Sequence, residues 1–581
     1  MTLDQEVDWI SMRKNLIATL LMVALLVVLL VPLSWLLSIG LDAAEMSDAD
    51  HMIQPMLDML AQSPKMQAQV PVEPVMDIED AWTIEDTREE LWEMPLVIGM
   101  RDKENELGFD AQSNTFYCTL GLDDGEDWPE LALFAQGAQG KENLRVAWID
   151  DYTYDYRSDA IREGYRYELL AYTDTHYAYL GIVFTGLPTV SLHVHGGADA
   201  LGDAYTPARV NIASTEHEAI NASAWIHVRG GGSIKPIDKE SYRIEFHDYT
   251  NRGDEKTARS VLGMSADTDW LLIGNAQEPT AIRNHLCWEM WRMWNEGASM
   301  ITPLESRLVE LFVDDEYMGL YQVLERIDIP QEIIRIGGSA QTDTVARCIV
   351  GVNIDEYPVL NRKEEANLWI EHRYAARDNY KRTFARIEDY VRLMLTGEQA
   401  LSDEEFVALA QKRVSTREMI SYYLFSQVCG LSADNIFNNL YIWALDSKEG
   451  YMYYVSPWDM DLSLSIPTEG MEVEKGESLE MSFSLPCRML DLNVDHARDI
   501  MWEIWQEKRA SVISDDGLYA WIEGLGETIL ASGAYARETE KWYGEAKELA
   551  TGSILYYTMS RVKNVENGIR EIWPAQNMTQ Q

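Results

Sequence analysis

Two short polar segments, ADNIFNN and SPWDMD, place carboxylate and amide side chains beside apolar, strand-like sequence. Oxygen atoms of this kind are hard ligands of the type that Mg²⁺ and Mn²⁺ prefer, with phosphate oxygens completing the coordination shell. The two segments are separated by NLYIWA and GYMYYVSP, which is typical of a β-hairpin, and a hairpin brings its two ends together. We therefore expect one divalent metal site where four side chains converge: Asp434, Asn439, Asp459 and Asp461.

The spacing inside the first segment resembles a known catalytic device. Asp434 lies five residues before Asn439, as the catalytic Asp precedes a metal-binding Asn in protein kinases. In that arrangement Asp434 accepts the proton of a substrate hydroxyl, while Asn439 and Asp459 hold the metal near the transferring phosphoryl group. Each segment alone is equally compatible with a capped turn or an exposed loop. The metal-site interpretation rests on both segments bracketing one hairpin.

Further candidates precede the hairpin in the chain. The segment RGGGS lies between two strand-like stretches, and its glycines would let backbone N–H groups approach a phosphate closely. Lys239 follows it and could reach the phosphates as a point charge. Glu325 ends a later strand, where it would lie near the junction of two lobes, and we expect it to contact the bound nucleotide. A flexible turn, a solvated strand edge and a surface carboxylate are the alternatives for these three features.

The elements that must position these residues indicate an α+β fold. TVSLHV, AWIHVRG and SYRIEF alternate like strands, and VELFVDDEYMGLYQVLERID is typical of a hairpin. TAIRNHLCWEMWRMW predicts an amphipathic helix. After residue 365 the sequence is mainly helical. We expect a β-rich lobe of about 150 residues followed by a helical lobe of about 200, with a ligand bound between them.

Charge and cysteine content exclude several classes of protein. The 581 residues carry a formal net charge of −48, which argues against a nucleic-acid binder and against docking on anionic lipid. The same charge leaves a basic protein partner open. The 5 cysteines are scattered without metal-ligand spacing, so neither a disulfide framework nor a zinc site is expected.

The N-terminal region predicts a single-pass membrane protein. Residues 16–39 are apolar and uncharged, and a helix of this length would span about 36 Å. Basic residues precede this segment and acidic residues follow it, so residues 1–15 are expected to form a cytoplasmic tail with the large domain extracytoplasmic. A cleaved signal peptide is the alternative. An acidic membrane-proximal stalk is expected at 40–110 and a β-rich accessory region at 111–184.

Five segments, in this order, resemble the spore-coat protein H kinase family, the CotH kinases. The resemblance covers about residues 185–530. The segments that carry it are RGGGSIKPIDKESYRIEF, DWLLIGNAQEPTAIRNHLCWEMW, VELFVDDEYMGLYQVLERID, ADNIFNNLYIW and YVSPWDMDLS.

The resemblance implies an atypical protein-kinase-like fold of two lobes at 185–575. It also implies transfer of the ATP γ-phosphoryl group to Ser or Thr of coat or envelope proteins, with Mg²⁺ or Mn²⁺ as metal. The residue roles that it implies are a catalytic Asp434, metal ligands Asn439, Asp459 and Asp461, and a nucleotide-contacting block with Arg229 and Lys239.

Two other functions remain open from the residues alone. A kinase-like fold can move AMP or glutamate with the same ATP–metal apparatus. A catalytically inactive scaffold for envelope or coat assembly, which binds a partner through its acidic and aromatic N-terminal regions, is the second alternative.

Overall fold

The protein is an α+β protein, as its sequence predicts. We analysed a computed structural model of the chain, which divides into two compact units. The residues that the structure describes are 97–102, 105–122, 131–136, 145–148, 156–172, 177–230, 237–250, 253–295, 300–327, 344–348, 370–374, 380–397, 400–431, 435, 439–447, 450–464, 479, 481–547, 549 and 551–574.

The described residues of the smaller unit form antiparallel strands. β1 (Val97–Asp102) pairs with β5 (Leu131–Gln136), and β6 (Arg145–Trp148) pairs with β7 (Arg166–Tyr172). Most of β8 (Tyr177–Thr185) belongs to the same unit. It takes its strands from the predicted stalk and accessory regions, whose boundaries stay predictions.

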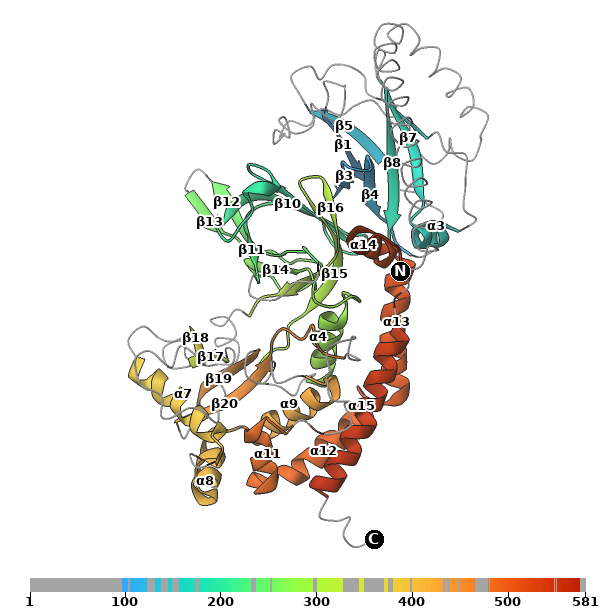
Figure 1. The fold of residues 1–581 in the computed structure, drawn as a ribbon. Coiled ribbons are helices and arrows are strands. Elements are labelled where there is room, and N and C mark those ends of the chain that lie inside the picture. The colour runs from blue at the N-terminus through green and yellow to red at the C-terminus, as the bar shows by residue number, and fades with distance from the viewer. Residues whose placement is uncertain are drawn as a thin grey trace, which may run out of the picture. The chain divides into compact units, whose positions relative to one another are not determined.

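A closed β-barrel forms the first part of the larger unit (Figure 1). Within the described residues seven strands follow the order β11-β10-β9-β15-β16-β14-β12, and pairing of β11 with β12 closes the ring. All neighbours are antiparallel except β9 and β15. The strands are β9 (Thr189–Val194), β10 (Thr206–Ala213), β11 (Ile220–Arg229), β12 (Ser241–Thr250), β14 (Asp269–Ile273), β15 (Ser306–Val313) and β16 (Glu316–Glu325). A further short strand, β13 (Gly253–Lys256), pairs with β12 outside the ring.

Apolar side chains at alternating positions along the strands fill the barrel interior. Side chains two residues apart on one strand point to the same face, and on β15 this places Val309, Leu311 and Val313 in one buried cluster. Every other strand of the ring contributes to the same cluster in the same spacing, for example Tyr242, Ile244 and Phe246 of β12. The barrel is therefore a packed core.

The β15–β16 hairpin turns at Asp314 and Asp315, whose φ values of 45° and 63° are left-handed. Asp tolerates this backbone conformation better than most residues, which suits a two-residue hairpin turn. The register shifts between Leu311 and Phe312, and Gly319 lies opposite this bulge with φ 91°. The predicted hairpin is confirmed.

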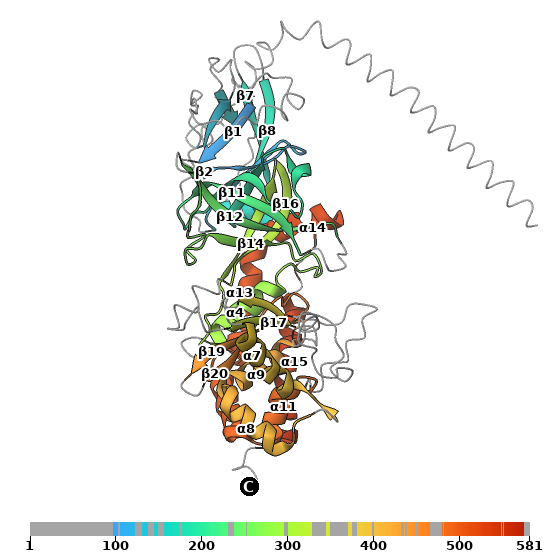
Figure 2. The same cartoon turned by 90° about the vertical axis from the view of Figure 1, so that its left-hand side faces the viewer.

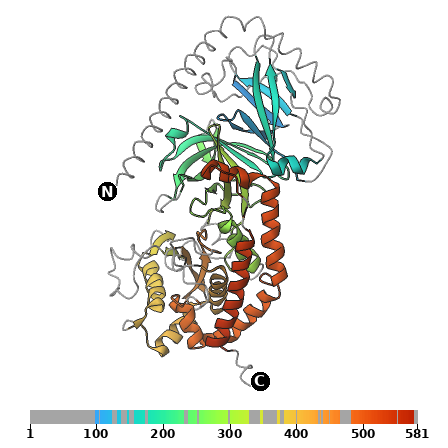
Figure 3. The same ribbon diagram turned by 45° about the vertical axis from the view of Figure 1, so that its right-hand side comes forward.

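Helices make up most of the described residues after the barrel, as predicted, and α13 and α15 pack side by side (Figure 3). The β19–β20 hairpin lies among these helices and pairs with β17 through β19 (Figure 2). The bounds of these elements are α7 (Tyr380–Met394), α8 (Asp403–Arg413), α9 (Thr416–Cys429), α11 (Ser484–Asp491), η5 (Val494–His496), α12 (Ala497–Arg509), α13 (Asp515–Ala531), α14 (Ala534–Tyr543), α15 (Thr551–Ile572), β17 (Thr344–Cys348), β18 (Ile370–Tyr374), β19 (Leu440–Ser447) and β20 (Gly450–Pro457).

The larger unit also has shorter elements, which precede the barrel strands in the sequence or lie between two of them. They are β2 (Asn105–Glu106), β3 (Gly108–Asp110), β4 (Thr115–Thr119), α3 (Arg157–Glu163) and η2 (Ala198–Ala200).

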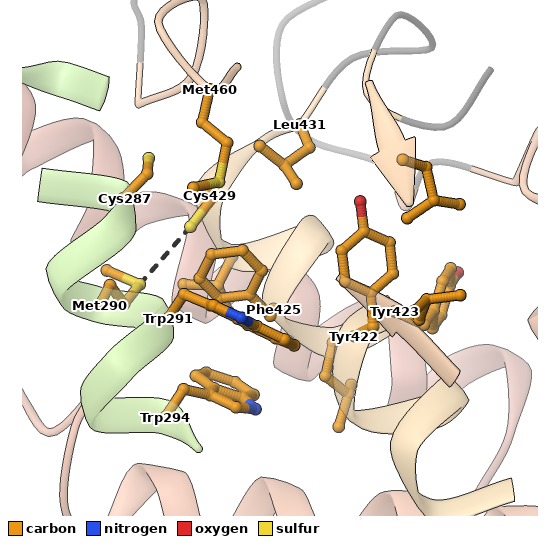
Figure 4. Close-up of a cluster of buried hydrophobic side chains, with 14 of the residues drawn as sticks. Cys287, Met290, Trp291, Trp294, Tyr422, Tyr423, Phe425, Cys429, Leu431 and Met460 are labelled. Carbon is orange, nitrogen blue, oxygen red and sulfur yellow. Dashed lines mark hydrogen bonds between the residues drawn. The ribbon is translucent and has the colours of Figure 1, made fainter. Parts of the chain in front are cut away.

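Helix α4 (Arg283–Trp294) packs against β15 of the barrel and against α9. The helix itself is confirmed, but the predicted amphipathic pattern is wrong, since five successive side chains from Asn284 to Trp288 are all buried. Figure 4 shows the reason: Trp291 and Trp294 pack on Phe425 of α9, with ring centroids 4.7 Å and 6.0 Å apart. A helix enclosed on several sides keeps only a narrow polar edge, here the Glu289–Arg292 ion pair.

The predicted single-pass membrane placement is corrected. Among the helices that the structure describes, none combines the length and the apolar character needed to cross a membrane. The segment that carried the prediction, residues 16–39, lies outside the described residues, as do the predicted tail at 1–15 and most of the predicted stalk.

Candidate active site

The β19–β20 hairpin brings the two polar segments together. Its strands pair from Leu440 opposite Pro457 onward, so the residues just outside this pair are neighbours in space. The backbone N–H of Trp458 donates to the Asn439 carbonyl at 3.0 Å. Asn439 and Asp459 therefore stand at the same open end of the hairpin, although 20 residues separate them in the sequence.

Asp459 is held in an unusual backbone conformation. Its φ is 51°, in the left-handed region, and its side chain is exposed. The buried side chain of Asn435 fixes the backbone beneath it, since its Nδ2 donates to the carbonyls of Trp458 at 3.1 Å and Asp459 at 2.8 Å. A non-glycine residue at positive φ persists only where surrounding bonds hold it, and these bonds direct an acidic side chain outward.

Asn284 connects the same loop to the barrel. Its Oδ1 accepts from the Met460 N–H at 3.1 Å, and its Nδ2 donates to Gln322 Oε1 of β16 at 3.0 Å. Asn284 is 2% exposed and Gln322 is 0% exposed, so both bonds are shielded from water. One amide side chain thus ties the acidic loop of the helical part to a barrel strand.

We expect Asn284→Ala to lower the free energy of unfolding by about 2–3 kcal/mol, because two buried polar groups lose their partner at once. Urea denaturation followed by tryptophan fluorescence measures this change. Arg292→Ala on the same helix is the control, since Arg292 is half-exposed and pairs with Glu289 at the surface, an ion pair worth at most about 1 kcal/mol. Equal losses in the two variants would contradict the bridging role of Asn284.

The donor set at the hairpin end fits a hard divalent cation. Asn439 supplies an amide oxygen and is 4% exposed, whereas Asp459 supplies an exposed carboxylate and Asp461 a half-buried one. Mg²⁺ commonly takes only one or two protein carboxylates and completes its shell with water and phosphate oxygens. Among the described residues, no three His, Cys, Asp or Glu side chains group as a metal site. Asp434 lies outside these residues.

Arg229 lies beside the acidic loop. It ends β11, and its guanidinium carbon is 5.8 Å from the ring centroid of Trp458, the residue before Asp459. Gly230 follows with φ 81° and is exposed. The rest of the glycine-rich segment, residues 231–236, is outside the described part of the chain.

Lys239 lies in the interior rather than on a strand edge. Its Nζ donates to Glu538 Oε1 of α14 at 2.6 Å and to the Leu320 carbonyl at 2.7 Å, and its side chain is 0% exposed. Glu538 Oε2 accepts from the Leu320 N–H at 2.7 Å. Burial lowers the pKa of Lys239 and raises that of Glu538, while their mutual attraction opposes both shifts. A phosphate contact by Lys239 stays a prediction, and it requires this ion pair to open.

Glu325 is the last residue of β16 and lines a pocket of about 300 Å³. Its Oε2 accepts from the Glu305 N–H at 2.7 Å. Burial raises the pKa of Glu325 to about 7, and the neighbouring carboxylates of Glu305 and Asp267 add to the rise against the backbone hydrogen bond. Its assignment to the nucleotide stays a prediction.

Three residues of this region were missed by sequence reasoning. Asn435 directly follows Asp434, and Asn284 lies in one of the segments that carry the family resemblance, so both had a local signal. Glu538 had none, because it lies 299 residues from Lys239 in an ordinary helical stretch.

The comparison with known proteins agrees with the motifs. The sequence model of the family described as CotH kinase protein matches residues 226–571, which is more than half of the chain. This range includes every predicted site residue, from Arg229 to Asp461. No curated protein matches the chain. Since the match covers the barrel strands from β11 onward, the hairpin and the helices to α15, the chain belongs to the CotH kinase family.

Proposed function

We propose that this protein is an ATP-dependent protein kinase of atypical, two-lobed architecture that phosphorylates Ser or Thr side chains of a protein acceptor. Family membership suggests a kinase-type transferase. The hairpin end carries the more specific proposal, because it joins an amide oxygen and an exposed carboxylate on a backbone fixed by buried asparagines. A plain turn does not need two buried asparagines to fix its backbone.

Each residue has one task in the proposed reaction. Asp434 orients the acceptor hydroxyl and takes its proton as the oxygen bonds to the γ-phosphorus and the bond to the β–γ bridging oxygen breaks, releasing ADP. Asn439 and Asp459 would hold Mg²⁺ or Mn²⁺, with Asp461 as a further ligand. The bound metal would neutralise charge on the phosphate oxygens.

Arg229 and Lys239 would serve the nucleotide. Arg229, beside Trp458, would offer a guanidinium to the phosphates, a group suited to bidentate phosphate recognition. Lys239 would contribute only after separation from Glu538. The net charge of −48 favours a basic acceptor, and hydroxyl transfer requires Ser or Thr in it, as in a Ser/Thr-rich coat or envelope protein.

Titration calorimetry of the full chain with ATP tests this proposal. We expect ATP to bind in the presence of Mg²⁺ or Mn²⁺ and to lose its affinity when EDTA removes the metal, because the phosphates share the metal with Asn439 and Asp459. Labelled ATP then distinguishes the transferred group: γ-label on a basic Ser-rich peptide supports the kinase, whereas α-label indicates AMP transfer.

Two outcomes would overturn the proposal. If ATP fails to bind in the presence of Mg²⁺ and also in the presence of Mn²⁺, the protein is a kinase-shaped scaffold without nucleotide chemistry. Metal-dependent binding with ATP-driven incorporation of glutamate, and no γ-label on the peptide, would replace the kinase by a glutamyl transferase.

A further inference from the structure

A pocket of about 300 Å³ lies where the ends of β14, β15 and β16 meet α4 and the β19–β20 hairpin. This volume is at the lower end of the range of small-molecule sites. Its lining residues come from six separate stretches of the chain.

Three tryptophans line the pocket beside aliphatic residues such as Ile301, Leu304 and Ile327. Trp288 and Trp291 come from α4 and Trp443 from β19. The Trp443 indole N–H donates to Ser456 at 3.0 Å, so this ring is held in place. Trp288 is 1% exposed, and its indole N–H has no hydrogen-bond partner among the described residues. A buried unpaired donor of this kind is costly unless a ligand atom accepts from it.

Negative charge dominates the polar part of the lining. Among the described residues, Asp267, Glu305 and Glu325 contribute carboxylates, and Arg326 contributes one guanidinium. That guanidinium also forms an ion pair, at 3.5 Å, with Asp269, which is not one of the lining carboxylates. Glu305 already pairs with Arg307 at 3.0 Å, so the charge argument rests on Asp267 and Glu325. A phosphate group is disfavoured beside such carboxylates, whereas a cation is favoured.

We propose that this pocket binds a small organic cation with an apolar body. Its guanidinium or ammonium group would lie against the tryptophan rings and the Glu325 carboxylate. Aromatic faces attract cations, and desolvation by the pocket walls strengthens that attraction. A carboxylate adds a charge-assisted hydrogen bond. The proposal does not depend on phosphoryl transfer, because it concerns the tryptophan-lined pocket and not the metal loop.

Binding should strengthen with rising pH. Glu325 has a pKa of about 7, raised chiefly by burial, and a cationic ligand favours its ionised form. The charged groups that face it are Glu305, Asp267 and Arg326, while α4, β19 and β20 contribute only Trp288, Trp291, Trp443 and Ser456. Between pH 6 and pH 8 we expect the affinity to rise several-fold as Glu325 loses its proton.

Benzamidine and its neutral analogue benzamide are the probes, titrated calorimetrically into the full chain without ATP. We expect benzamidine to bind about tenfold or more tightly than benzamide, and Glu325→Gln to remove most of that preference together with its pH dependence. Glu316→Gln is the matched control, because Glu316 lies on the same strand, is exposed and is absent from the pocket lining.

A second pair of probes identifies the source of the cation. Agmatine represents a free amine, and acetyl-arginine amide represents a side chain of a protein, whose carbonyl could accept from Trp288. Tighter binding of either one supports the proposal and names its source. Equal binding of benzamidine and benzamide, or a Glu325→Gln variant that still prefers benzamidine, would overturn it. So would displacement of benzamidine by ATP alone, which would assign the pocket to the nucleotide.

Discussion

Replacing Asp459 by Asn is expected to weaken metal-dependent ATP binding and phosphoryl transfer by more than about 100-fold. Loss of an outer-shell partner already costs about 10–100-fold in metal affinity, and Asp459 is proposed to touch the metal itself. Asn tolerates the left-handed backbone at φ 51° and keeps the carbonyl that accepts from Asn435. The substitution therefore removes the charge and little else.

Calorimetry with ATP and Mg²⁺, followed by transfer of γ-label, measures this effect. Asp315→Asn is the control, since Asp315 also has a left-handed backbone, φ 63°, but lies in the turn of the β15–β16 hairpin. We expect that variant to bind ATP like the wild type. An Asp459→Asn protein that retains full metal-dependent binding would remove Asp459 from the site and leave the hairpin end as a structural turn.

Replacing Glu538 by Gln is expected to lower the free energy of unfolding by about 3–5 kcal/mol. This is the usual loss when one partner of a buried ion pair is removed, because the other charge stays buried and uncompensated. Lys239 has no exposed side-chain surface, and Glu538 also accepts from the Leu320 N–H. α14 would lose one buried ion pair with the barrel and keep another, that of Arg537 with Glu310 of the β15–β16 hairpin at 2.8 Å.

The same helix and hairpin supply the control. Lys541 of α14 pairs with Glu316 of β16 at 2.6 Å, but Glu316 is 56% exposed. Glu316→Gln should therefore change the free energy of unfolding by at most about 1 kcal/mol. Urea denaturation of the two variants beside the wild type makes the comparison. Equal stability of the Glu538→Gln and Glu316→Gln proteins would contradict this prediction. It would mean that Lys239 loses its proton or becomes hydrated without lowering the free energy of unfolding.

Local patterns were sufficient for the individual elements. Alternating apolar residues marked the barrel strands, and the acidic turn at Asp314 and Asp315 marked the β15–β16 hairpin. Hairpin geometry alone brought Asn439 next to the segment that contains Asp459, since each end of a hairpin must face the other. The family resemblance was also readable from five ordered segments, and the family match confirms it.

Closure of the barrel was beyond local patterns. It depends on the pairing of β11 with β12 and on the parallel pairing of β9 with β15, which joins strands more than 100 residues apart. Alternation shows only that a strand has one buried face; it does not say which strand lies next to it. The enclosed position of α4 was missed for the same reason, because its second apolar face became visible only with α9 packed on it.

The sequence by itself determined the family, the α+β class and the hairpin that brings Asn439 and Asp459 to one end, because these depend on short-range spacing. Only the tertiary structure decided which polar groups are buried and with whom. Lys239 has the sequence environment of a phosphate ligand, yet Glu538 pairs with it from a helix 299 residues away. Glu325 ends an ordinary strand, yet tryptophans from α4 and β19 enclose it in an acidic pocket. Burial and electrostatic pairing are sums over neighbours in space, and most of those neighbours are distant in sequence.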